Sequence, residues 1–184
     1  NNNPNLVSNV VTVTTEAQLQ VRNPGFEDYH TAIMRVERMT GADYDRPWYL
    51  PYKEGEDDIW WAVNSKKSMP NNHAQYLDYN WCKNFPCTAF STYAHTGEKS
   101  AMVYSVNVGF GNTDNTAVGT TYPGEIWIGK SDDSGNHTQD GHPFASRPAT
   151  IKFWYTYQPI NGESFVAVIS IRDSENNEIA RAEK

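Results

Sequence analysis

The sequence predicts an all-β fold, and three features of its 184 residues support that prediction. Residues 151–157 alternate between two faces, with Ile, Phe and Tyr on one of them, which is the period of a strand. A second run, 165–171, is apolar and β-branched, and the turn at 159–162 joins the two runs as an antiparallel hairpin. No stretch of the sequence shows a sustained helical period or an internal repeat. The pattern is typical of a β-sandwich.

The first half of the chain predicts fewer strands and longer loops. Residues 1–9 are polar and Asn-rich and predict a flexible leader, which leaves 10–184 as a single domain. Val-x-Val and Leu-x-Val alternations predict one strand in 10–21. Residues 40–80 are rich in Asp, Tyr, Trp, Pro and Asn, so we expect long loops with short strands there, and loops of that length are often functional.

The second half predicts strands at 89–94, 101–108 and 122–129, separated by polar turns and a Gly/Asn/Thr loop. Residues 178–184 begin another strand after a turn at 173–177. We expect either a fragment truncated here or an attached segment or second chain that completes the sheet, because an unpaired strand edge is an aggregation hazard. The first residue is not Met, so we expect a mature or trimmed form of an exported protein.

Composition limits the partners of the chain. The net charge is -7 and no Lys/Arg cluster occurs, which excludes the basic face that nucleic-acid binding needs and disfavours anionic membranes. No apolar run has the length of a membrane span. Aromatic residues make up 13% of the chain, a share that suits a secreted β-sandwich presenting rings to a ligand and equally a β-rich core.

One pattern in the second half resembles a known family. A Phe and an Arg-Pro pair precede an aromatic strand that ends in Tyr-x-Tyr-x-Pro, namely Phe144, Arg147, Pro148, Tyr155, Tyr157 and Pro159. This pattern resembles the carbohydrate-metabolism domain of Bacteroidetes surface proteins. The segment 57–64 is similar to a Trp-x-x-Asn segment of the same family, with Trp61 and Asn64 in the matching places. The resemblance implies a galactose-binding-like jelly roll at the bacterial cell surface.

Two further motifs are similar to carbohydrate-binding jelly rolls. The sequence Asn-Pro-Gly-Phe-Glu at 23–27 matches their opening, and His-Thr-Gly-Glu-Lys-Ser-Ala at 95–101 matches a later turn. In those proteins the glutamate and the turn's backbone oxygens hold a structural calcium, which implies a site made by Glu27, Gly97, Lys99 and Ser100. The family's later acidic partner would fall beyond Lys184. Without the resemblance, Glu27 would be interpreted as an exposed residue beside a turn.

The aromatic middle of the chain is the first candidate for a sugar site. Indole rings stack on the C–H faces of sugars, while Asn and Asp side chains bind their hydroxyls. The candidate residues share this chemistry and lie in or beside the predicted loops: Trp48, Trp60, Trp61, Asn64, Tyr79 and Trp81. The alternative is that most of these rings fill the core of the sandwich.

Acidic residues beside these tryptophans raise a catalytic alternative. Glycoside hydrolysis needs two carboxylates across the scissile bond, one of them with a raised pKa. The available carboxylates are Glu54, Glu56, Asp57 and Asp58. A run of neighbouring acidic residues is more often a solvated loop.

The cysteines and histidines predict structural roles. Cys82 and Cys87 lie five positions apart, and in an exported protein we expect them to form a disulfide that closes a small loop. A zinc site would need two more ligands, and no histidine has suitable spacing. His95 and His142 are expected to pack in turns, and Arg147 to pair with a loop carboxylate.

The sequence therefore predicts an exported domain that binds a carbohydrate through loop aromatics, with a structural calcium. Two alternatives stay open. One is a glycoside hydrolase or a domain of one, and the other is a structural or adhesive surface domain without a sugar ligand.

Overall fold

The computed structural model describes residues 19–38, 42–69, 73–74, 85–107, 121–146, 150–160 and 162–184. The chain divides into two compact units, Asn1–Arg147 and Pro148–Lys184. A compact unit is not by itself a domain, so the single domain expected over 10–184 stays a prediction. The leader expected at 1–9 and most of the strand expected at 10–21 lie outside the described residues.

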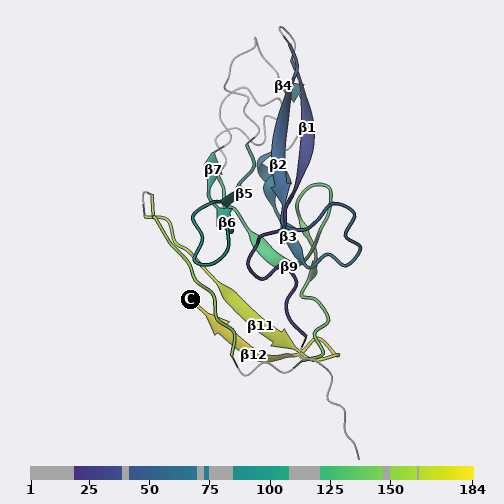
Figure 1. The fold of residues 1–184 in the computed structure, drawn as a ribbon, viewed down its shortest axis with the longest axis vertical. Coiled ribbons are helices and arrows are strands. Elements are labelled where there is room, and N and C mark those ends of the chain that lie inside the picture. Colours follow the sequence, from purple (N-terminus) through teal and green to yellow (C-terminus); the bar gives the residue numbers. More distant parts are fainter. Residues whose placement is uncertain are drawn as a thin grey trace, which may run out of the picture. The chain divides into compact units, whose positions relative to one another are not determined.

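Strands dominate the described part of the chain (Figure 1), which confirms the all-β prediction. The jelly-roll order of strands stays a prediction. The elements are β1 (His30–Arg38), β2 (Tyr44–Leu50), β3 (Trp61–Val63), α1 (Ser65–Ser68), β4 (His73–Ala74), β5 (Thr88–Ser91), β6 (Ser100–Val103), β7 (Val106–Asn107), β8 (Thr121–Tyr122), β9 (Ile126–Ser131), β10 (His137–Asp140), β11 (Val168–Arg172) and β12 (Glu178–Glu183). No helix within the described residues is long and apolar enough to cross a membrane.

The longest strand pair is β1 with β2, joined antiparallel from His30 opposite Leu50 to Val36 opposite Tyr44. β4 pairs parallel on the other side of β1, so β2 is an edge of this sheet as far as the described residues show. An edge position explains why β2 tolerates Pro47, since a proline has no N–H to donate to a further strand.

The core of the first unit lies beside this sheet and the short helix α1. Met34 of β1 and Met69, directly after α1, are both buried and in contact. The rings of Tyr44 and Trp48, both on β2, pack against them. Thioether side chains adapt to irregular gaps, which suits a contact between a sheet and a single helical turn.

The second sheet has the order β10-β9-β3, and the candidate site described below adjoins the start of β3. β3 pairs antiparallel with β9, with Trp61 opposite Ile128, and β9 pairs with β10 through an irregularity at 137–139. Gly129 of β9 has a φ of +151°, and a Cβ there would lie 2.0 Å from the carbonyl oxygen of Gln139. Only glycine therefore permits the close approach of β10 to β9.

The remaining strands of the first unit form two small pairs. β5 pairs antiparallel with β6, and β7 with β8. These pairs agree in part with the strands expected at 89–94, 101–108 and 122–129, of which the last is divided between β8 and β9.

The second unit is a hairpin of β11 and β12, paired antiparallel from Val168 opposite Glu183. It confirms the strand expected at 178–184, and β11 covers the end of the run expected at 165–171. The strand expected at 151–157 is wrong, because residues 150–160 contain no strand. The alternation there still brings side chains together, since the Tyr155 ring stacks on Phe165 at 5.1 Å. A two-residue period groups side chains on one face, but a strand also needs a hydrogen-bonded neighbour.

Candidate functional site

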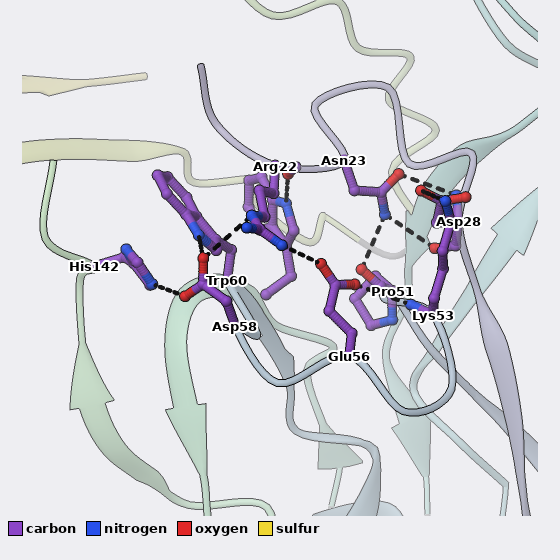
Figure 2. A network of polar contacts seen from close by, with 10 residues as sticks. Arg22, Asn23, Asp28, Pro51, Lys53, Glu56, Asp58, Trp60 and His142 are labelled. Carbon is purple, nitrogen blue, oxygen red and sulfur yellow. Dashed lines mark hydrogen bonds and ion pairs between the residues drawn. The ribbon is translucent and has the colours of Figure 1, made fainter. Parts of the chain in front are cut away.

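The candidate site is centred on the Asp58 carboxylate, which three donors hold (Figure 2). Asp58 Oδ2 accepts a hydrogen bond from Trp60 Nε1 at 3.1 Å and pairs with Arg22 Nε at 3.1 Å. Its Oδ1 lies 2.8 Å from His142 Nε2. The bond from Trp60, followed by those to His142 and Arg22, lowers the pKa of Asp58. The carboxylate is therefore ionised at neutral pH, and its side chain is still 46% exposed.

Trp60 is the buried base of this cluster, with only 4% of its surface exposed. The His142 ring stacks on it with a centroid separation of 4.0 Å, and Phe144 meets it edge-on. His142 Nδ1 lies 3.0 Å from the carbonyl oxygen of Pro143, so both ring nitrogens face acceptors. A neutral imidazole can donate to one of them and an imidazolium to both.

Arg22 links the cluster to a second carboxylate and to Trp61. Its Nη1 lies 3.1 Å from Glu56 Oε1, and Glu56 Oε2 accepts the backbone N–H of Lys53. The carbonyl oxygen of Arg22 accepts the Trp61 indole N–H at 2.8 Å. Phe26 packs against the half-buried Trp61 ring at 4.7 Å. Three segments that are distant in sequence thus meet at one surface. We call this group the acidic cluster, meaning Arg22, Glu56, Asp58, Trp60, Trp61 and His142.

The acidic loop was the candidate for a glycosidase acid–base pair. Glu56 and Asp58 share one guanidinium, and the pKa of Asp58 is lowered, whereas a general acid needs a raised pKa. Within the described residues, every carboxylate with a clear pKa shift moves in this same downward direction. Glu54 and Asp57 are exposed. Asp58 is therefore suited to hold charge at a surface rather than to act as a general acid.

Asn64 is 1% exposed, and both ends of its amide are bonded within the protein. Its Nδ2 donates to the carbonyl oxygen of Pro123 and to Glu125 Oε2, and its Oδ1 accepts from the Glu125 N–H and the Cys87 thiol. No polar atom of this side chain is left for a ligand. In this structure Asn64 therefore serves the fold.

The other expected sugar-binding residues have different surroundings. Trp48 packs against the methionine core, and Lys66 Nζ lies 5.5 Å from the centre of its ring. Trp61 is the half-buried ring of the acidic cluster described above. Tyr79 and Trp81 lie outside the described residues, so their part in sugar binding stays a prediction.

Glu27 and the turn at 97–100 do lie together, as the two jelly-roll motifs implied. The carboxylate accepts the N–H of Glu98 at 3.1 Å and that of Lys99 at 3.3 Å, while Lys99 Nζ donates to the Glu27 carbonyl oxygen at 2.9 Å. Ser100 Oγ donates to the Tyr93 carbonyl oxygen. Amide and ammonium donors face these oxygens, an arrangement that does not fit a cation between Glu27 and the turn.

Metal ligands do not gather elsewhere in the described part of the chain. Among those residues, no group of three or more His, Cys, Asp or Glu side chains could hold a metal ion. The structure does not test calcium binding as such, which stays a prediction.

Cys87 is a free, fully buried thiol in this structure, and its Sγ lies 3.1 Å from Asn64 Oδ1. Burial raises the pKa of this thiol, which disfavours a reactive thiolate. Its expected disulfide partner, Cys82, lies outside the described residues, as does Arg147. The disulfide therefore stays a prediction.

Sequence reasoning missed the two partners that organise the cluster. Arg22 stands directly before the 23–27 motif but is not part of it, and His142 was expected only to pack in a turn. His142 is 84 positions from Asp58, and no short-range pattern in the sequence links them. Comparison of the chain with protein-family models, with curated proteins and with solved structures found no match.

Proposed function

We propose that this protein binds a carbohydrate at the surface formed by Arg22, Asp58 and Trp61. The observation that supports this function is a fixed but accessible charge pair beside an indole. The side chains of Arg22 and Asp58 are 52% and 46% exposed, although each is held by several partners. Trp61 is bonded to the backbone of Arg22 and is half-buried.

Such a surface has the chemistry that sugar recognition needs. A sugar presents hydroxyl groups, which donate to a carboxylate and accept from a guanidinium, and an apolar C–H face, which packs against an indole. Because Glu56 and Trp60 already fix Arg22 and Asp58, binding would cost little side-chain entropy. The low pKa of Asp58 keeps it an acceptor at neutral pH.

The proposal also includes the type of β fold and the place of the protein in the cell. The motifs around Glu27, Trp61 and Tyr155 support a galactose-binding-like jelly roll, and the resemblance to surface proteins supports export to the bacterial cell surface. In this proposal the protein recognises a glycan without cleaving it, because the pKa of Asp58 is lowered, whereas a general acid needs a raised pKa.

The test is a glycan array followed by calorimetry on any glycan that binds. Trp61→Ala and Asp58→Asn should each weaken binding at least about tenfold, which corresponds to about 1.4 kcal/mol. Glu54→Gln is the matched control, since it removes a charge from the same loop outside the cluster, and it should bind as the wild type does. Melting curves show that each variant is folded.

Two results would contradict the proposal. A glycan that binds equally well to the wild type and to folded Trp61→Ala and Asp58→Asn variants would put the site elsewhere. A blank array with folded wild-type protein, both with calcium and with a chelator, would favour the adhesive alternative.

A further inference from the structure

The turn that holds Glu27 presents N–H groups to it, and trans peptide geometry then fixes the direction of its carbonyl groups. In a trans peptide the C=O points opposite to the N–H. The described residues contain no cis peptide bond. Because the N–H groups of Glu98 and Lys99 point at the Glu27 carboxylate, the carbonyl groups of Gly97 and Glu98 point away from it. These carbonyl oxygens and the carboxylate cannot share one cation.

The space between Glu27 and the turn is also closed. A Cβ placed on Gly97 would lie 1.9 Å from Glu27 Oε1 and 2.7 Å from its Cδ, so the carboxylate rests directly on the glycine backbone. The φ of Gly97 is +76°, a left-handed conformation that turns successive N–H groups toward one point. Such a concave pair of amides is an anion-binding nest.

A positive charge is already supplied from within the chain. The Lys99 ammonium donates to the Glu27 carbonyl oxygen at 2.9 Å and lies 5.8 Å from the centre of the Phe90 ring. Tyr29, close by, keeps its proton, because burial and then the charge of Glu27 raise its pKa. The main-chain carbonyl oxygen of Glu27 therefore already bonds to an ammonium, its carboxylate bonds to two amides, and the nearby phenol is neutral.

We propose that the 97–99 turn is an anion-binding nest, that Glu27 occupies it with its own carboxylate, and that the Lys99 ammonium supplies the positive charge beside it. The Glu27 clasp, meaning this carboxylate, the two amides and the Lys99 ammonium, then fastens the turn before β6 to the segment before β1 without calcium. A small carboxylate is the class of ligand that an emptied nest would accept.

The experiment uses the whole chain and follows the melting temperature. Wild-type Tm should be the same with calcium as with a chelator. Glu27→Ala empties the nest and should lower Tm by about 2–4 °C or more. Sodium acetate should then restore part of that loss relative to sodium chloride at the same ionic strength, whereas calcium should not. Glu98→Gln is the matched control, because its main-chain N–H remains and its exposed side chain changes charge by the same amount.

A second variant separates the ammonium from the nest. Lys99→Met keeps most of the side-chain length and loses the donor, so it should also lower Tm, with no response to acetate. The proposal is overturned if a chelator lowers the wild-type Tm and calcium restores it. It is equally overturned if acetate raises the Tm of Glu27→Ala no more than it raises that of the wild type. If Glu27→Ala does not fold, the proposal is tested with Glu27→Gln and Lys99→Met instead. Their Tm is compared with calcium and with a chelator, as for the wild type.

Discussion

Asn64 and Glu125 exchange two hydrogen bonds across 61 positions of sequence. Asn64 Oδ1 accepts the Glu125 N–H at 2.8 Å, and Asn64 Nδ2 donates to Glu125 Oε2 at 3.0 Å. The amide lies directly after β3, and Glu125 directly before β9. This pair therefore fastens together the ends of the two strands that position the acidic cluster.

Replacing Asn64 by Asp should destabilise the protein by about 3 kcal/mol. The new carboxylate oxygen would face Glu125 Oε2 and the Pro123 carbonyl oxygen, which are both acceptors, in a place that is 1% exposed. Urea unfolding measures the loss. Glu125→Gln supplies the control, because removing its charge should make Asn64→Asp less costly. An equal cost in both backgrounds would show that the two side chains do not interact.

Gly97→Ala should be more destabilising than Gly55→Ala, although both glycines have nearly the same φ, +76° and +77°. A Cβ at Gly55 meets nothing within 4 Å, so only the backbone strain of about 1–2 kcal/mol remains there. A Cβ at Gly97 also displaces the Glu27 carboxylate. Thermal melts should show this excess disappearing when Glu27 is already Ala. Its persistence in that background would exclude Glu27 as the cause.

Trp60→Ala should cost about 3–5 kcal/mol, because it empties a buried site and removes a donor to Asp58. Trp61→Ala should cost clearly less, since its ring is only half-buried. The stability cost of Trp60→Phe should lie between those of Trp60→Ala and Trp61→Ala, because this variant keeps a ring against His142 and loses the indole N–H. Urea unfolding of the three variants gives the order. A Trp61 cost equal to that of Trp60 would mean that both rings belong to the core.

The sequence predicts the all-β class and several strands because local patterns determine them. The Asp173 carboxylate accepts two N–H groups of its own turn, so β12 follows from a few neighbouring residues. The sequence did not predict β1, because its apolar residues Ala32, Ile33 and Met34 are consecutive and such a run fits a helix and a strand equally well. β2 lies in the region 40–80, where only short strands between long loops were expected, because Pro47 favours a loop and only an edge position, a tertiary feature, permits a proline in a strand.

The acidic cluster was predicted only in part, for the same reason. The sequence identifies Asp58, Trp60 and Trp61 as neighbours with the right chemistry, but it does not tell which ring is buried. Which of the two rings is exposed depends on His142 and Arg22, and tertiary packing brings these two residues to the cluster. The contact between Glu27 and the 97–100 turn was predicted, whereas the direction of its amides was not. That direction depends on the left-handed φ of one glycine.

The charge of Asp58 should make the stability of the folded protein depend on pH in the acidic range. Its pKa is below the ordinary value of 3.8 in the folded protein, because Trp60, His142 and Arg22 favour the charged form. A lowered pKa contributes stability above the unfolded value, and that contribution is lost as the pH falls through the folded value. Asp58→Asn should therefore lower Tm at neutral pH, and its difference from wild type should shrink toward zero below about pH 4. Melting curves at a series of pH values measure it, with Asp57→Asn as the exposed control from the same loop. A difference that stays constant into strong acid would show that the charge of Asp58 contributes nothing to the fold.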